Sequence, residues 1–401
     1  MKITEIKAFV TMPPEAFNNY VFVKVGTDEG IVGWGESSMG ARSVKAVIEE
    51  IGETLIGENP FRIDEHWQKL YHLYHNVRGG VMQMAAISGI EIALWDIKGK
   101  ALGVPMHALL GGKLRDRIRM YCDCHSGAFW TAEDYDRRWR EVRETGVLDA
   151  VYEPAAFVEQ AKRVVAEGFD AIKFDVDVAN PWKTDVYDRS ISRREHEHIV
   201  TIVEDVREAI GPYVDLAIDL HGSFNLPDAL RICKDVEHLD LLWLEDPVRW
   251  EWGNVDALAK ICMQTETPIC TGEILHGAKL HRALIEAQAC DLLEPDIPWS
   301  GGAIEIRRIA ELAEMHHMSI APHNMASPIT AVAAAHICST IPNFLALEYH
   351  SGNIPLWGKM LDVKDPIQQG YMTVPDGPGL GVELDEDEIA AHLPSRAALW
   401  S

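Results

Sequence analysis

Short apolar runs alternate with longer amphipathic stretches from about residue 118 to residue 347. The short runs are typical of buried strands, and the longer stretches repeat apolar residues at helical spacing. Such alternation favours a parallel sheet with both faces covered. Eight strands over roughly 230 residues, with seven helices between them, favour a closed (β/α)7β-type TIM barrel, and a doubly wound open sheet is the alternative. We predict strands at 118–122, 171–174, 214–218, 239–244, 268–270, 291–293, 318–321 and 344–347, and helices at 157–167, 193–210, 226–235, 255–264, 279–287, 304–315 and 329–341.

The first part of the chain follows a different pattern. Residues 1–36 are typical of a β-meander, and helical periodicity follows at 43–56, 62–74 and 82–101. We therefore expect an N-terminal α+β capping domain at 1–116 and a TIM-like barrel at 117–375. The turn-rich segment 376–401 is expected to pack on the capping domain.

Charge and composition exclude several classes of function. The chain carries 62 acidic and 37 basic residues, a formal net charge of −25, which argues against nucleic-acid binding through a basic face. No apolar run is long enough to span a bilayer, and no signal-peptide core is present, so a cytoplasmic protein is expected. The seven cysteines are scattered, which favours reduced thiols over disulfides or a zinc site.

Three carboxylates follow consecutive apolar runs in the middle of the chain. They are Asp219, Glu245 and Glu273, and the intervals between them are 26 and 28 residues, about one strand, one loop and one helix. The carboxyl ends of neighbouring barrel strands meet at one mouth. Three hard oxygen donors there predict a Mg²⁺ site that stays open for a substrate carboxylate.

Other predicted strand ends also carry polar residues. Lys173 and Asp175 share one face because side chains alternate along a strand, and a lysine there would neutralise a bound carboxylate. Asp219 shares a face with His221, so a metal ligand and a proton donor lie together. A structural ion pair for Lys173 and a surface position for His221 are the alternatives.

The last three strands supply a predicted general base and its partner. If the sixth and seventh strands are neighbours, Asp296 can hold one ring nitrogen of His323 and raise the basicity of the other. Glu348, at the end of the eighth strand, is a further partner for a substrate carboxylate. Each residue alone is weak support, but polar residues at seven successive strand ends form a specific pattern.

The chain resembles the enolase superfamily, in the mandelate racemase and muconate lactonising enzyme group, and within it the sugar-acid dehydratases acting on galactonate or gluconate. The resemblance covers essentially the whole chain. It rests on Trp34-Gly35-Glu36, Ala93-Leu94-Trp95-Asp96-Ile97-Lys98-Gly99-Lys100, Leu110-Gly111-Gly112, Asp219-Leu220-His221-Gly222, Glu245-Asp246-Pro247, Pro295-Asp296, Gly301-Gly302, Ala321-Pro322-His323 and Gly377-Pro378-Gly379-Leu380-Gly381.

The resemblance implies an activity and roles for particular residues. It implies a Mg²⁺-dependent aldonate dehydratase, with Mg²⁺ ligands at Asp219, Glu245 and Glu273. It implies His323 and Asp296 as the base that removes the proton α to a carboxylate, His221 as the acid that releases the β-hydroxyl, and Lys173 and Glu348 beside the substrate carboxylate. It also implies a homo-oligomer that binds a small acid sugar, with no nucleic-acid or membrane partner.

One position departs from the racemases of the group, which carry Lys-x-Lys at the second strand. Here Asp175 replaces the second lysine, and this favours elimination over racemisation. An epimerase or racemase, a lactone cycloisomerase, and a non-catalytic protein that retains the fold remain the alternatives.

Specificity is expected from the loops at 12–20 and 75–78, which could close over the mouth. The predicted substrate contacts, beyond those named above, are Arg78, His125, Asp175 and Trp299, with Trp250 and Trp252 as further aromatic candidates.

Overall fold

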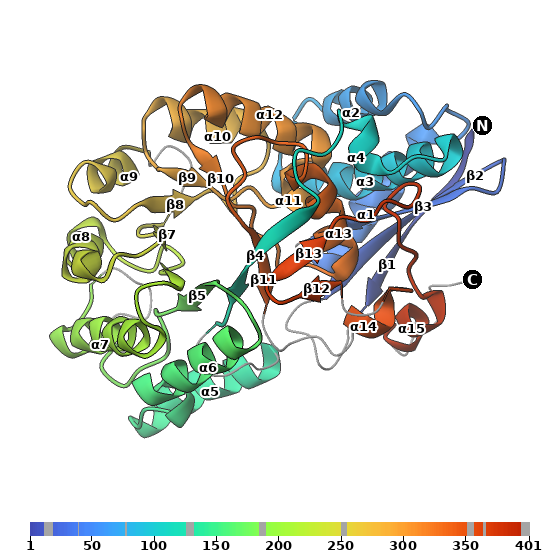
Figure 1. Ribbon diagram of the computed structural model, residues 1–401. Coiled ribbons are helices and arrows are strands. Elements are labelled where there is room, and N and C mark those ends of the chain that lie inside the picture. The colour runs from blue at the N-terminus through green and yellow to red at the C-terminus, as the bar shows by residue number, and fades with distance from the viewer. Residues whose placement is uncertain are drawn as a thin grey trace.

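The fold is a parallel barrel covered on one side by an α+β domain (Figure 1). The computed structural model describes residues 1–11, 19–38, 40–76, 78–125, 132–183, 190–249, 255–350, 357–363 and 366–393. Among these residues, none of the helices is both long enough and apolar enough to cross a membrane.

The barrel strands pair in parallel and in the order in which they occur in the chain. The two ends of the sheet meet, because β11 pairs with β4 and Ile320 of β10 bridges Phe344 just before β11. The capped TIM barrel is therefore confirmed, and the open-sheet alternative is wrong. The strands are β4 (Arg117–Asp123), β5 (Ala171–Asp175), β6 (Asp215–Asp219), β7 (Trp243–Glu245), β8 (Ile269–Thr271), β9 (Leu292–Leu293), β10 (Ser319–Ile320) and β11 (Leu347–His350).

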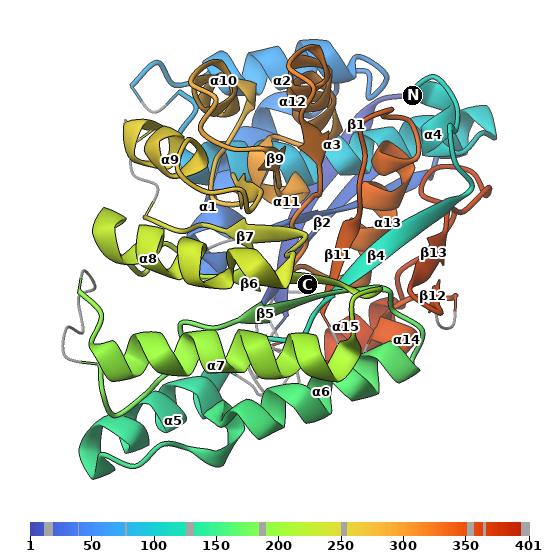
Figure 2. The ribbon, with the colours of Figure 1, turned by 60° about the vertical axis from the view of Figure 1, so that its left-hand side comes forward.

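The helices lie outside this sheet, and Figure 2 shows α6 and α7 running along the outer side of β5 and β6. The predicted helices are all present, with ends that differ by a few residues. Strand β7 begins four residues later than expected, because 237–239 forms a 3₁₀ turn and Asp240 is left-handed at φ 51°. Strand β11 begins three residues later than expected, and the helices α5 and α11 were not predicted. The helices are α5 (Ala132–Thr145), α6 (Pro154–Ala166), α7 (Arg193–Ile210), α8 (Leu226–Val236), α9 (Val255–Cys262), α10 (Ala278–Glu286), α11 (Ile297–Ser300), α12 (Ala303–Met315) and α13 (Pro328–Cys338).

A layer of apolar side chains fills the inside of the barrel. Each barrel strand, or the residue beside it, contributes one member, so the barrel interior is packed and forms a floor. Two large rings form the centre of the layer, where Tyr121 meets Trp243 edge-on with ring centroids 5.0 Å apart. The members are Tyr121, Ala171, Ala217, Trp243, Cys270, Leu292, Ala321 and Ala346.

The capping domain packs an antiparallel sheet of β1 (Ile3–Thr11), β2 (Tyr20–Thr27) and β3 (Val32–Ser37) against helices α1 (Ala41–Gly52), α2 (Ile63–His72) and α3 (Val81–Leu102). A short helix, α4 (Met106–Leu109), follows. Buried residues occur all around α3, which therefore has no polar face for solvent and lies between the cap sheet and the barrel. Strand β3 can approach α3 closely because Gly35 has no side chain. A Cβ at that position would overlap the Gly89 carbonyl oxygen.

The end of the described chain contacts both larger parts. A hairpin of β12 (Ile367–Gln368) and β13 (Tyr371–Thr373) pairs antiparallel with β4. Beyond it, the Leu380 amide donates to the Asp96 carboxylate of α3, and the Met106 amide donates to the Gly379 carbonyl. The helices α14 (Trp357–Met360) and α15 (Glu386–Ala391) lie beside the cap sheet (Figure 1), where Lys24 pairs with Glu386 at 2.8 Å.

Candidate active site

A ring of polar side chains lies directly above the apolar floor. Because side chains on a strand alternate, the residue two positions after each floor residue points to the same interior. For seven of the eight floor residues, the residue two positions later is polar. These polar residues are Asp123, Lys173, Asp219, Glu245, Glu294, His323 and Glu348. After β8 the step reaches Gly272, whose φ of 124° turns the chain so that Glu273 joins the ring.

Three of these residues form a group with the geometry of a metal site. Asp219, Glu245 and Glu273 offer ligand oxygens that all lie within 4.8 Å of one another. The register explains part of this, since Asp219 is the strand partner of Glu245. All three donors are hard carboxylate oxygens, a set that suits a divalent cation such as Mg²⁺. The predicted carboxylates are therefore brought together, and their role as ligands stays a prediction.

The electrostatics of the group also suit a cation. Burial, and then the repulsion of Asp219 and Glu273, raise the pKa of Glu245 well above its ordinary value, against the attraction of Lys173. Burial and the charge of Asp219 likewise raise the pKa of Glu273, while His323 lowers it. Closely spaced carboxylates disfavour one another's charge unless a positive charge lies among them. A divalent ion removes this conflict.

Lys173 supplies part of that positive charge. Its Nζ lies 2.6 Å from Glu245 Oε1 and 2.9 Å from Glu348 Oε1, and 3.7 Å from Asp219 Oδ2. The side chain is 2% exposed, so these ion pairs are shielded from water. Burial lowers the lysine pKa, but the carboxylates of Glu245 and Glu348 outweigh it and raise the pKa well above its usual value. Lys173 is thus a fixed cation at the centre of the mouth.

His323 and Asp296 form the predicted dyad. The Nδ1 of His323 lies 2.7 Å from Asp296 Oδ2, and its Nε2 points to Glu273 Oε2 at 3.3 Å and to Glu348 Oε2 at 3.6 Å. Burial lowers the pKa of His323, while Glu348 and Glu273 raise it well above its ordinary value. The Asp296 bond fixes which nitrogen faces the carboxylate group, so that a proton can be exchanged only at Nε2.

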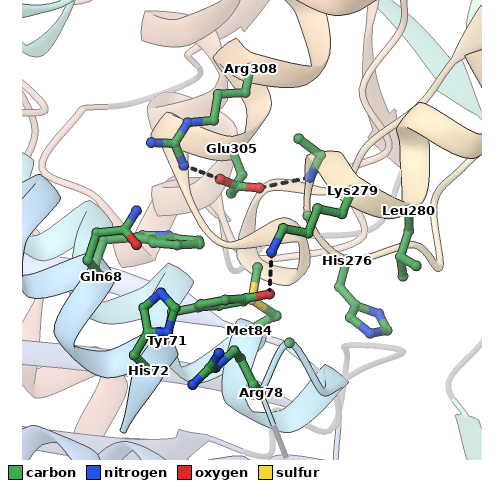
Figure 3. Close-up of a pocket in the computed structure, with 14 residues that line it drawn as sticks. Gln68, Tyr71, His72, Arg78, Met84, His276, Lys279, Leu280, Glu305 and Arg308 are labelled. Atoms are coloured by element: carbon green, nitrogen blue, oxygen red, sulfur yellow. Dashed lines mark hydrogen bonds and ion pairs between the residues drawn. The ribbon is translucent and has the colours of Figure 1, made fainter. Parts of the chain in front are cut away.

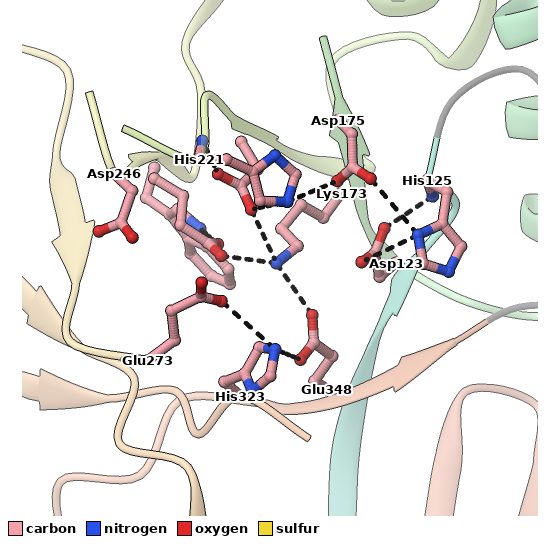
Figure 4. Close-up of polar contacts among 12 residues, drawn as sticks. Asp123, His125, Lys173, Asp175, His221, Asp246, Glu273, His323 and Glu348 are labelled. Atoms are coloured by element: carbon pink, nitrogen blue, oxygen red, sulfur yellow. Dashed lines mark hydrogen bonds and ion pairs between the residues drawn. The ribbon is translucent and has the colours of Figure 1, made fainter. Parts of the chain in front are cut away.

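His221 approaches the same carboxylates from another side (Figure 4). Its Nε2 is 3.3 Å from Asp219 Oδ2, and its Nδ1 is 3.0 Å from Asp177 Oδ1. Asp177 also accepts a 2.6 Å hydrogen bond from Ser223 Oγ, so this carboxylate is itself held in place. The residue His221 has φ 44°, a conformation that is uncommon for a non-glycine residue and typical of functional loops.

Asp177 is a residue that the sequence analysis missed. Its signal was available, because it lies two positions beyond Asp175 and four beyond Lys173, and so continues the same two-residue period just past the end of β5. Asp246 is a further buried acid near the group, and burial together with Glu273 and Asp219 raises its pKa to about 8. It accepts a hydrogen bond from the Thr271 hydroxyl, which ties β7 to β8.

Glu348, Asp175 and His125 also reach the mouth. The Glu348 carboxylate accepts a 2.7 Å hydrogen bond from the Asn324 amide, in addition to its bond with Lys173. Although burial opposes it, Lys173 holds the pKa of Glu348 below its usual range. Asp175 lies 3.4 Å from His125 Nδ1. Their predicted roles in substrate binding stay predictions.

The remaining predicted contacts lie elsewhere or outside the described residues. Arg78 lines a separate cavity of about 400 Å³ between α2 and α10, which Figure 3 shows, together with Tyr71, Lys279 and Arg308. Trp299 is buried on α11, three residues after Asp296. The residues 12–18, Val77, Trp250 and Trp252 lie outside the described part of the chain.

Comparison with known families agrees with this geometry. Residues 8–111 match the mandelate racemase / muconate lactonizing enzyme N-terminal domain, and residues 156–388 match the enolase C-terminal domain-like family. The chain therefore belongs to the enolase superfamily, in its mandelate racemase and muconate lactonizing enzyme group, and the resemblance noted in the sequence is confirmed.

Individual relatives show which members of the family the chain is similar to. The chain is 42% identical over 385 residues to a D-xylonate dehydratase of Haloferax volcanii, covering 95% of this chain and 87% of that protein. It is 33% identical over 408 residues to a D-galactonate dehydratase of Variovorax paradoxus, covering 100% and 96%. A crystal structure of a mandelate racemase/muconate lactonizing enzyme-like protein from Rubrobacter xylanophilus superposes with a TM-score of 0.88 at 34% identity, covering 100% and 99%.

Proposed function

We propose that this protein is a Mg²⁺-dependent acid-sugar dehydratase that removes water from an aldonate to give a 2-keto-3-deoxy acid. The observation that carries the proposal is the placement of two imidazoles at one carboxylate group. His323 reaches it at Glu273 and His221 reaches it at Asp219, each at 3.3 Å. The similarity to D-xylonate and D-galactonate dehydratases supports the same reaction and names the first substrates to test.

The three carboxylates are the proposed ligands of Mg²⁺. Asp219, Glu245 and Glu273 fit the ion because they offer only oxygen and their donor atoms converge within 4.8 Å. When bound there, Mg²⁺ supplies positive charge beside the substrate carboxylate as negative charge develops on it. Lys173 adds a second positive charge from within the ring, and Glu348 fixes the lysine from the opposite side.

The two histidines have opposite tasks in this proposal. His323 Nε2 takes the proton from the carbon next to the carboxylate, and Asp296 stabilises the imidazolium that results through its 2.7 Å contact with Nδ1. His221 Nε2 then gives a proton to the departing β-hydroxyl, while Asp177 holds the other ring nitrogen. One C–H and one C–O bond break, water leaves, and the enol product becomes the 2-keto acid.

The second candidate is an epimerase or a lactone cycloisomerase with the same first step. These reactions need no acid for a leaving hydroxyl, so the presence of an oriented His221 favours dehydration. The second lysine of the racemases is Asp175 here, and its partner is His125 at 3.4 Å. A carboxylate held by an imidazole is a different group from a free amine base.

A homo-oligomer in the cytoplasm is also part of the proposal, and light scattering on the purified protein tests the assembly.

The function is tested with a panel of aldonates led by D-xylonate and D-galactonate. The purified enzyme with Mg²⁺ is expected to form 2-keto acid from at least one of them. His323→Asn should lower kcat by about 10²–10⁴-fold or more. His221→Asn should lower keto-acid formation but keep exchange of the α-proton with D₂O, because His323 is intact.

The exposed residue His316, directly after the end of α12, offers a matched control, and His316→Asn should keep full activity. Epimerised substrate without keto acid would favour the second candidate. Unchanged turnover in His323→Asn would refute the assignment of the base.

A further inference from the structure

A second group of metal-binding residue types lies beside the carboxylate group, where the barrel closes. Asp123 is the last residue of β4, His125 follows it two positions later, and His350 is the last residue of β11. The parallel pairing of these strands makes His350 the direct strand partner of Asp123. All three residues are buried, at 4%, 8% and 5% exposure. Neither the three carboxylate ligands nor the two catalytic histidines belong to this group.

The distances suit a single cation held by three donors. One ligand atom from each residue lies within 4.8 Å of the others. The Nδ1 of His350 is 2.9 Å from His125 Nε2 and 3.6 Å from Asp123 Oδ2. Metal–ligand bonds of about 2.0–2.1 Å place neighbouring donors about 2.9–3.4 Å apart for angles between 90° and the tetrahedral value. The nitrogen of His125 nearest to Asp123 is Nδ1, at 3.9 Å from Oδ2, so the Asp123 carboxylate and the His125 ring both have to shift for all three residues to bind one ion.

The outward nitrogens of both imidazoles face carboxylates. His125 Nδ1 is 3.4 Å from Asp175 Oδ2, and His350 Nε2 is 3.9 Å from Glu348 Oε2. With a proton on each outward nitrogen, the lone pairs of His125 Nε2 and His350 Nδ1 point toward each other across 2.9 Å, an arrangement that favours a positive species between them. A ligating histidine commonly donates its second ring nitrogen to a carboxylate, as His125 Nδ1 can to Asp175. The contact of His350 Nε2 with Glu348 is longer than a hydrogen bond, so a carboxylate faces this ring without a direct bond to it. The two facing nitrogens hold either one shared proton or one metal ion.

We propose that Asp123, His125 and His350 bind a second divalent cation, of the kind that imidazole prefers, such as Zn²⁺ or Co²⁺. Its donor set of two nitrogens and one oxygen differs from the all-oxygen set of the proposed Mg²⁺ site, so the two sites select different ions. Three protein ligands leave a coordination position for water or a substrate hydroxyl. Glu348 contacts both His350 and Lys173, which places this position at the same barrel mouth.

The test is direct binding of Co²⁺ to the untagged full chain in saturating Mg²⁺. Co²⁺ is a probe whose visible absorption reports its ligands, and calorimetry gives the number of ions bound. We expect one Co²⁺ per chain that Mg²⁺ does not displace. His350→Gln should abolish this binding, and Asp175→Asn should weaken it about 10–100-fold because the orienting carboxylate is lost.

Two controls separate this site from the proposed Mg²⁺ site. Glu273→Gln alters only the carboxylate group and should leave the Co²⁺ binding unchanged, as should the surface variant His316→Asn. X-ray absorption at the cobalt edge of the wild-type protein should show two imidazole ligands, a result that does not depend on any variant folding. Because the readout is binding, failure of dehydratase activity would not affect it.

Three results would overturn the inference. They are the absence of a Co²⁺ ion beyond the Mg²⁺ site, unchanged Co²⁺ affinity in a folded His350→Gln protein, and an absorption spectrum with fewer than two imidazole ligands. Loss of the Co²⁺ signal in Glu273→Gln would equally contradict it, since the ion would then belong to the carboxylate group.

Discussion

The buried acid Glu36 joins the capping domain to the barrel, and its protonation can be tested. It lies at 1% exposure on β3 and accepts hydrogen bonds from the first turn of α13. The amide of Ser327 donates at 3.0 Å and its hydroxyl at 2.6 Å, and the Thr330 hydroxyl donates as well. Burial nevertheless outweighs these bonds and raises the pKa of Glu36 to about 7.

The consequence for stability has a definite sign. The folded protein binds this proton more tightly than the unfolded chain, whose carboxyl pKa is 4.5. The contribution to stability is therefore complete below pH 4.5 and is lost as pH rises through 7. At about 1.36 kcal/mol per unit of pKa difference, the loss is about 3 kcal/mol. Glu36→Gln keeps the protonated shape and does not titrate, so it should gain relative stability as pH rises.

Urea unfolding of both proteins at pH 5, 6, 7, 8 and 8.5 measures this difference, because other titrating groups cancel between them. The relative stability of Glu36→Gln should rise by about 2.5 kcal/mol across the series, because part of the total change lies below pH 5. Glu314 is exposed on α12, and Glu314→Gln serves as a control with no pH trend. A difference that stays flat, or that favours wild type as pH rises, would show that the bonds from Ser327 and α13 keep Glu36 ionised throughout.

Three further predictions concern the acid, the cap and the surface. Asp177→Asn should lower keto-acid formation more than α-proton exchange in D₂O, because it removes only the support of His221. Gly35→Ala should destabilise the cap by at least about 1–3 kcal/mol in urea unfolding, since the new Cβ overlaps Gly89, whereas Gly30→Ala meets no neighbour and should cost about 1 kcal/mol of backbone strain. The net charge of −25 predicts a Tm that rises between 0.01 and about 0.15 M NaCl, as salt screens repulsion among surface carboxylates.

Much of the fold and the carboxylate group could be predicted because both follow from a two-residue period. The strands are short and apolar, so the first polar residue after each one marks its carboxyl end, and Asp219 and Glu245 are found in this way. Helix α5 was missed because Tyr135, Trp139 and Val142 are its only large apolar residues, too few for a clear amphipathic pattern.

The contacts that the sequence could not predict join distant segments. His125 was a predicted site residue and His350 was not, and only closure of the barrel brings His350 Nδ1 within 2.9 Å of His125 Nε2, 225 residues away. Arg78 lies in the connection between α2 and α3 and lines a cavity with residues of α10 and α12, and the sequence carries no local signature of which distant segments it meets. Local patterns predict which face a residue occupies, whereas the partner across a closure is set by the tertiary fold.

The meeting of the first and last barrel strands has a consequence for how the protein assembles itself. Residues 123–125 and 348–350 come from the first and last barrel strands, 225 residues apart at the two rings, so a folding species with an incomplete barrel lacks the pair of rings. The imidazole NMR signals of His125 and His350 would then report the pairing of β4 with β11, which closes the barrel. Folding kinetics followed at these two rings would measure the rate of barrel closure separately from the rate of hydrophobic collapse.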